Sequence, residues 1–276
     1  AVRWLRRGGT TGQALKGTLF GLPLPVCSCG VVPLYQSLTQ RGVPSAAALA
    51  FLVATPELGV DALLISLPLL GAEMTIARLL CAAVVAVFVA LTVSRWIHTE
   101  HGEAKDEEET GVTASQVGTG LRYGFEDLVD DTMPWIIAGL VIAAMANPLL
   151  DAEWLRQLPT GIEIPLFALL GMPVYVCAAG ATPIVAVMLM HGVSPGAGIA
   201  FLLTGPATNF TTYGVLSELH GRGPALFFGL AVALGAIGVG FATDSYFAGS
   251  LTSPLIEGHM HQDSLHQQIA LGALAL

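Results

Sequence analysis

The chain repeats its own pattern at a fixed spacing of 150 residues, without a gap inside the matching segments. The sequence GLPLPVCSCGVVPL, which starts at Gly21, returns as GMPVYVCAAGATPI from Gly171. RGVPSAAALAFLVATP, which starts at Arg41, returns as HGVSPGAGIAFLLTGP from His191. Both copies are apolar and are interrupted by proline and glycine. Interrupted apolar repeats of this kind are typical of secondary transporters, in which the binding site lies between the repeats.

The composition is that of an integral membrane protein. Only 11% of the residues are charged and 54% are hydrophobic, whereas a soluble domain carries about 25% charged residues. A membrane-spanning helix needs about 20 consecutive apolar residues. The segments that meet or approach this length are 19–40, 43–70, 73–97, 132–150, 163–190, 193–218 and 223–248. The sequence therefore predicts an all-α polytopic membrane protein.

Four of these segments are interrupted, in two pairs related by the repeat. Segments 19–40 and 163–190 each carry prolines and glycines, and segments 43–70 and 193–218 are expected to break at Thr55-Pro56-Glu57 and at Gly205-Pro206-Ala207. Segments 73–97 and 223–248 are interpreted as uninterrupted apolar helices. Because broken backbone inside a membrane is tolerated only where protein or a wet cavity covers it, the four breaks predict a central cavity that all four line.

The order of segments divides the chain into a first repeat (1–97), a polar acidic linker (98–122), a second repeat (123–250) and a histidine-containing loop with the start of a helix (251–276). More Lys and Arg residues precede the first repeat than the second, which favours opposite membrane sides for the two. This predicts inverted repeats with re-entrant segments 19–40 and 163–190. If all the intervening segments cross, the repeats are parallel instead. We also expect the full-length protein to have a further helix at each end.

The motif PVCSCGVVP places two thiols, Cys27 and Cys29, in a proline- and glycine-interrupted intramembrane segment. Cys177 is the repeat-related counterpart of Cys27 and supplies a third sulfur. Thiolates are the preferred ligands of soft metals and metalloids, so the three cysteines are the predicted metal and substrate ligands. Buried cysteines also serve as small apolar packing residues, and this is the interpretation we favour for Cys81.

Polar residues at the breaks extend the predicted substrate site. Thr55, Thr204 and Asn209 are expected to face the cysteines, since the ends of broken helices present unpaired amides and carbonyls to a substrate. Asn209 could instead cap the second half-helix. Glu57 and Asp61 are four residues apart, which predicts a shared helix face, and an ionisable group at membrane depth is a functional candidate. They are the predicted proton-coupling residues, unless they lie near a membrane end or bond to broken backbone.

Other classes of site find little support in the sequence. The chain has no phosphate-binding glycine loop and no catalytic Ser/His/Asp or HExxH arrangement, and no basic patch suggests nucleic acid. Four cysteines do not form a disulfide framework. Clustered histidines could bind zinc or copper weakly, although solvated loop histidines are the simpler interpretation. These histidines are His98, His101, His259, His261 and His266. No resident cofactor is expected.

The motifs PVCSCGVVPL, FLVATPELGVD, FEDLVDDTMPWIIAGLVIAA and FLLTGPATNF together resemble those of the ArsP-type predicted permeases, over nearly the whole chain. The resemblance implies a duplicated polytopic protein, located in the bacterial inner membrane. It further implies efflux of trivalent organoarsenicals, as in some members, or of copper and zinc, as in a branch with histidine-rich loops. The thiols that the family implies in metalloid binding correspond to Cys27 and Cys29, and through the internal repeat to Cys177.

These observations give the hypothesis of a permease, not an enzyme, that exports a thiophilic metal or metalloid by alternating access with proton coupling. Its expected partners are the transported ion, the lipid bilayer and further copies of itself. Two alternatives stay open at this point. One is a membrane thiol-redox enzyme that cycles the Cys27–Cys29 pair, and the other is a metal-sensing membrane subunit.

Overall fold

The computed structural model describes residues 2–97 and 161–247, apart from positions 7, 25, 27, 173–176 and 191. Within this part of the chain all regular structure is helical and no strand occurs, so the all-α prediction is confirmed there. The predicted linker 98–122, the segment 132–150 and the terminal loop 251–276 lie outside it. The helices are α1 (Val2–Arg6), α2 (Thr10–Gly21), α3 (Ser28–Gln40), α4 (Ser45–Leu58), α5 (Val60–Val93), α9 (Glu163–Gly171), α10 (Ala178–Met190), α11 (Pro195–Ala207), α12 (Phe210–His220) and α13 (Arg222–Phe247).

Two helices in the described part are long and apolar enough to cross a membrane, namely Ala62–Val93 and Arg222–Phe247. The first of these is kinked at Gly71, where φ is 77°. The other helices are short, and the longest of them, α4, has 14 residues. At about 1.5 Å per residue, such helices cannot cross a hydrocarbon core about 30 Å thick. The described part of the fold therefore combines two helices long enough to span a membrane with several helices of about half that length.

The helix breaks lie slightly beyond the positions predicted from proline. Helix α4 continues through Pro56 to Leu58 and ends at Gly59, whose ψ of 148° is extended. Similarly, α11 continues through Pro206 to Ala207. The predicted breaks at Thr55-Pro56-Glu57 and Gly205-Pro206-Ala207 were therefore placed too early, because a proline in the last turn removes one donor without ending the helix. Likewise, the predicted segment 19–40 is two helices, the first of which begins at Thr10.

Structural features recur at the 150-residue spacing of the sequence. Helices α3 and α10 have equal length and related bounds. Gly42 and Gly192 both have a positive φ, and so do Gly71 and Gly221. Glycine is needed at these turns because other residues rarely adopt that region. We refer below to residues 2–97 as the first half and to residues 161–247 as the second half.

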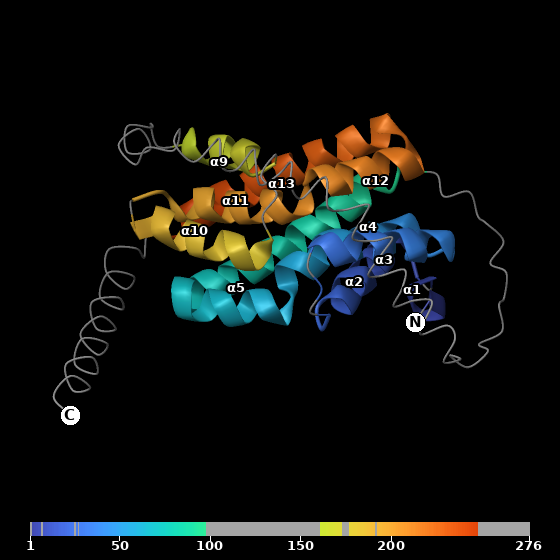
Figure 1. Ribbon diagram of the computed structural model, residues 1–276, viewed down its shortest axis with the longest axis horizontal. Coiled ribbons are helices and arrows are strands. Elements are labelled where there is room, and N and C mark those ends of the chain that lie inside the picture. The colour runs from blue at the N-terminus through green and yellow to red at the C-terminus, as the bar shows by residue number, and fades with distance from the viewer. Residues whose placement is uncertain are drawn as a thin grey trace, which may run out of the picture.

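The two halves contact each other through short helices and also through the long helices α5 and α13. Helix α2 packs on α4 and α9 packs on α11 within each half, while α3 contacts α12 and α10 contacts α5 across the halves. In Figure 1, α3 and α10 both start near the middle of the molecule and run towards its opposite ends. The centre of the core is formed by α4 and α11, in which all side chains from Ala46 to Leu58 and from Gly196 to Ala207 are buried.

The long helices expose regular apolar stripes. On α5 and α13, large hydrophobic side chains spaced four residues apart are at least 42% exposed. Residues four apart share a helix face, and exposed apolar faces of this extent mark contact with another protein or with lipid. The stripes consist of Ile76, Leu80, Val84 and Phe88 on α5 and of Leu226, Leu230 and Leu234 on α13. They are the faces on which a surrounding bilayer would lie.

Candidate functional site

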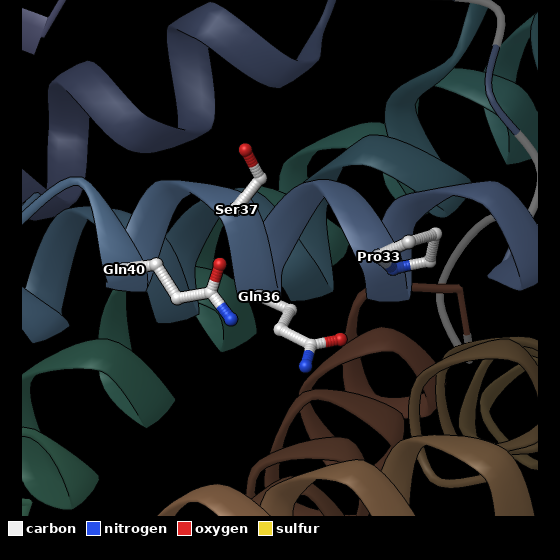
Figure 2. Close-up of a pocket in the computed structure, with 4 residues that line it drawn as sticks. All are labelled: Pro33, Gln36, Ser37 and Gln40. Carbon is white, nitrogen blue, oxygen red and sulfur yellow. The ribbon is translucent and has the colours of Figure 1, made fainter. Parts of the chain in front are cut away.

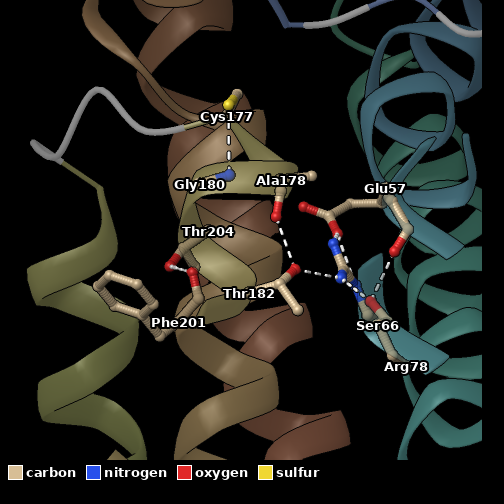
Figure 3. A network of polar contacts seen from close by, with 10 residues as sticks. Glu57, Ser66, Arg78, Cys177, Ala178, Gly180, Thr182, Phe201 and Thr204 are labelled. Carbon is tan, nitrogen blue, oxygen red and sulfur yellow. Dashed lines mark hydrogen bonds and ion pairs between the residues drawn. The ribbon is translucent and has the colours of Figure 1, made fainter. Parts of the chain in front are cut away.

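Cys177 is the one cysteine of the predicted metal site whose side chain the structure describes. It directly precedes α10 and is exposed. Its sulfur accepts a hydrogen bond of 3.4 Å from the backbone N–H of Gly180, in the first turn of that helix (Figure 3). The amides at a helix start favour negative charge on a neighbouring atom, which suits a thiolate ligand.

The other two predicted thiols are placed only in part. The backbone of Cys29 lies in the first turn of α3, the helix related to α10 by the repeat, whereas its side chain and the whole of Cys27 lie outside the described residues. No group of three or more His, Cys, Asp or Glu side chains with metal-binding geometry occurs among the described residues. The three-thiol cluster therefore stays a prediction.

A buried ion pair lies near the start of α10. The guanidinium of Arg78, on α5, donates to Oε2 of Glu57 from Nη2 at 2.8 Å and from Nε at 3.3 Å. Its Nη1 donates to Oγ of Ser66 at 2.6 Å and to Oγ1 of Thr182 at 2.9 Å. Thr182 in turn donates to the carbonyl of Ala178, in the first turn of α10. Figure 3 shows Arg78 at the centre of these contacts, between α5 and α10.

Both charges of this pair are withdrawn from solvent. Arg78 and Glu57 are each 1% exposed, and each would be costly to bury alone. The second carboxylate oxygen, Oε1 of Glu57, is buried and has no hydrogen-bond partner among the described residues. In the predicted proton-coupling residue Glu57, Oε2 is thus paired with the guanidinium of Arg78, and Oε1 has no hydrogen-bond partner among the described residues.

Arg78, Ser66 and Thr182 were not identified from the sequence. Segment 73–97 was interpreted as an uninterrupted apolar helix, and the structure does form a continuous helix there up to Val93, but the charge that Arg78 places in it was overlooked. The available signal was a single arginine within an apolar run, since an ionisable residue at membrane depth is a functional candidate by itself. Ser66 and Thr182 gave no signal, because a hydroxyl that bonds its own helix is common in apolar segments.

The prediction that Glu57 and Asp61 share a helix face is wrong. Glu57 lies in α4 and Asp61 in α5, and the extended Gly59 separates the two helices. Positions four apart are neighbours only within one continuous helix. The side chain of Asp61 lies outside the described residues, so its role in proton coupling stays a prediction.

The remaining predicted site residues are buried and bond to their own helices. Oγ1 of Thr55 donates to the carbonyl of Phe51 at 2.7 Å, and Oγ1 of Thr204 donates to that of Ala200 at 3.0 Å. In Figure 3, Thr204 lies on α11, apart from the Arg78 contacts.

Asn209 caps α12. Its Oδ1 accepts from the backbone N–H of Thr212 at 2.8 Å and from that residue's hydroxyl at 2.9 Å. This is the capping arrangement considered from the sequence as the alternative to a lining role. Contact between a substrate and Thr55, Thr204 or Asn209 stays a prediction.

A hollow of about 220 Å³ lies along α3 (Figure 2). Its lining residues are Pro33, Gln36, Ser37 and Gln40. These described residues all belong to α3 and include none of the predicted site residues. The predicted central cavity stays a prediction.

Comparison with known proteins assigns the chain to a family. A family model described as ArsP_1, predicted permease, matches residues 10–244. The chain belongs to this family. It is therefore a membrane protein of a permease family, whose description is that of a transporter rather than an enzyme.

Three relatives agree with the assignment. The chain is 28% identical to the UPF0718 protein YraQ of Escherichia coli, over 86% of this chain and 70% of that protein. It is 22% identical to the UPF0718 protein MJ0584 of Methanocaldococcus jannaschii, over 82% of this chain and 80% of that protein. It is 27% identical to a putative two-component membrane permease complex subunit of Streptococcus mutans, over 71% of this chain and 67% of that protein. No solved structure matches the chain.

Proposed function

We propose that this permease exports a thiophilic metal or metalloid species by alternating access. The observation that carries the proposal is the position of Cys177. Its sulfur lies at the start of a half-length helix in a membrane chain and accepts a bond from a helix-start amide. Because Cys27 precedes α3 at the repeat-related position, thiols from both halves would meet at the cargo, with Cys29 as the third ligand. Trivalent arsenic and monovalent copper suit such a sulfur set.

Alternating access is supported by the way the halves pack. Each half pairs its short helices internally, and the contacts of α3 with α12 and of α10 with α5 join the halves in matching fashion. An inverted pair of repeats that rocks about a central site is a common transporter design. On this proposal the four helix breaks line the central cavity, and Thr55, Thr204 and Asn209 lie near the cargo.

Proton coupling is assigned to Glu57 and Asp61. Glu57 has a buried oxygen with no partner among the described residues, which is a position that can accept a proton. Ligand thiols lose their protons when they bind a metal. On this proposal the thiols and Glu57 take up protons from the outer side after cargo release and give them to the cytoplasm as new cargo binds, so that inward proton flow drives export.

Uptake into everted bacterial membrane vesicles tests the function, with methylarsenite, copper and zinc compared side by side. We expect uptake of at least one of them, and we expect Cys177→Ser to remove most of it. Cys81→Ser is the matched control, because Cys81 is half-buried and contacts Thr243 on α13 instead of a helix start. Methylarsenite alone would identify an organoarsenical exporter, whereas copper or zinc would bring the loop histidines into the mechanism. Uptake of none of the three would refute the proposed function.

The inverted arrangement has a separate test. Single cysteines at Ser115 and Thr160 should be labelled by an impermeant thiol reagent from opposite sides of the membrane. Labelling of both from one side would instead make the repeats parallel.

A role as one subunit of a larger permease is the second candidate, which the name of the Streptococcus relative favours. Reconstitution of the purified chain alone in liposomes separates the two. Transport by the chain alone would show that it is sufficient, whereas transport restored only by a second membrane component would make it a subunit.

A further inference from the structure

Arg78 connects the two halves through a single nitrogen atom. Its Nη1 donates to Ser66 in the first half and to Thr182 in the second. Thr182 is fully buried on α10, the helix that directly follows Cys177. Any movement of α10 away from α5 must therefore break the bond between Arg78 and Thr182.

The position of Arg78 depends on the charge of Glu57. With the carboxylate ionised, the pair is neutral and four of the guanidinium N–H groups are engaged. With a proton on Glu57, the buried guanidinium would have no anion beside it. An uncompensated charge in a site without solvent is strongly unfavourable, so Arg78 would leave this position and release Thr182.

We propose that Arg78 is a latch between the halves, and that a proton on Oε1 of Glu57 opens it. The proposal rests on the alternating access proposed above and adds the residue that links proton binding to movement. Arg78 acts here as a positioning residue, because it holds α10 against α5 and need not touch the cargo. Opening the latch frees the helix whose start carries Cys177, so the thiol from the second half moves when the proton binds.

Arg78 is the only described charged partner of Glu57. Helix α4 packs against α2, α3, α5 and α11. Their other described titratable side chains are Lys16, Tyr35, Glu73 and Cys81. The amine of Lys16 donates to the backbone carbonyl of Trp4, and the bonds described for the carboxylate of Glu57 come from Arg78. In the described part of the site, the negative charge of Glu57 therefore balances the positive charge of Arg78.

The latch can be tested by the accessibility of a buried reporter on α10. Ala181 is fully buried, and Ala181→Cys introduces a thiol of modest size. The rate of its alkylation in detergent or liposomes is measured peptide by peptide with mass spectrometry, at one fixed pH. Glu57→Gln mimics the protonated carboxyl at that pH, and we expect it to raise the alkylation rate at position 181 at least about fivefold by local opening.

Two further variants and two controls define the result. Thr182→Val removes the acceptor on α10 while keeping the shape of the side chain, and Arg78→Gln removes the charge, so both should also raise the rate. Glu73→Gln makes the same chemical change at an exposed site of the same helix as Arg78 and should leave the rate unchanged. A second reporter, Ala200→Cys in the buried face of α11, should keep its wild-type rate in every variant.

An unchanged rate at position 181 in Glu57→Gln and Thr182→Val would overturn the latch. An equal increase at positions 181 and 200 would also overturn it, because it would indicate general loosening. The assay contains no cargo, so its outcome is independent of whether vesicles accumulate any metal. A positive reporter result with no transport would refute the proposed function alone, and transport with an unchanged reporter would refute the latch alone.

Discussion

The hydroxyl of Tyr35 lies 2.9 Å from Nε2 of His220, although the two residues are 185 positions apart. Tyr35 is fully buried on α3, and His220 is the last residue of α12, so this bond joins the first half to the second. The contact of Thr182 with Arg78 joins α10 to α5 across the related interface. Polar bonds therefore cross between the halves at more than one interface, and the contact of Cys81 with Thr243 is a further one.

Removing the hydroxyl of Tyr35 should destabilise the protein. Tyr35→Phe leaves the ring in place but removes a part-buried hydrogen bond to His220, and a bond of this kind contributes about 0.5–1.5 kcal/mol. Thermal unfolding in detergent should show a lower midpoint. Tyr246→Phe is the control, because Tyr246 is 76% exposed and its change should have little effect. Equal midpoints for Tyr35→Phe and the wild type would contradict a stabilising bond between Tyr35 and His220.

The ion pair makes a different prediction about stability. Arg78→Met leaves the carboxylate of Glu57 buried without a counter-charge, and breaking a buried pair in this way costs about 3–5 kcal/mol. The double variant Glu57→Leu/Arg78→Met removes both charges and should recover a large part of that loss. Arg95→Met, at an exposed position, provides the comparison. The unfolding midpoints of the four proteins give the measurement, and a double variant less stable than Arg78→Met would contradict the pairing.

The cysteines should differ in reactivity. Cys177 is exposed at the start of α10, whereas Cys81 is half-buried on α5 and its sulfur lies 3.5 Å from Oγ1 of Thr243. Alkylation of the native protein by N-ethylmaleimide should modify Cys177 about tenfold faster or more, because thiol reactivity depends on access. Mass spectrometry of the two peptides over time measures both rates in one sample. A higher rate at Cys81 would contradict the described positions.

The helical fold follows from features that a sequence displays directly. Apolar length predicted the helices, and the repeat of Gly21 and Gly171 with their neighbours predicted that related segments would look alike. The helix ends were less predictable. Pro56 suggested a break, yet α4 ends only where Gly59 turns extended, because which residue ends a helix depends on the local backbone and not on proline alone.

The candidate site was predictable only in part. Glu57 was identified because a carboxylate in an apolar segment is unusual, and the same reasoning applied to Arg78 would have found its partner. That these two meet, and that Thr182 joins them, depends on how α4, α5 and α10 pack. No spacing along the chain contains that information, since Arg78 and Thr182 are 104 positions apart.

The close packing of α2 on α4 gives a prediction that joins sequence and structure. A Cβ on Gly21 would overlap Oγ1 of Thr55, and a Cβ on Gly171 would overlap Oγ1 of Thr204. We therefore expect Gly21→Ala and Gly171→Ala each to destabilise the protein by about 1–3 kcal/mol, the usual cost of overpacking, with lower unfolding midpoints in detergent. Gly238→Ala, where an added Cβ meets nothing within 4 Å, is the matched control on α13.

Partial rescue distinguishes overlap from a general intolerance of alanine. The double variant Gly21→Ala/Thr55→Ala removes the overlapping oxygen, and the backbone atoms of Thr55 lie 3.3 Å from the added Cβ, so much of the stability should return. Rescue should be weaker for Gly171→Ala/Thr204→Ala, because the carbonyl oxygen of Phe201 lies only 3.1 Å from the Cβ position. If neither double variant is more stable than its single glycine substitution, side-chain overlap is not the reason for glycine at these two positions.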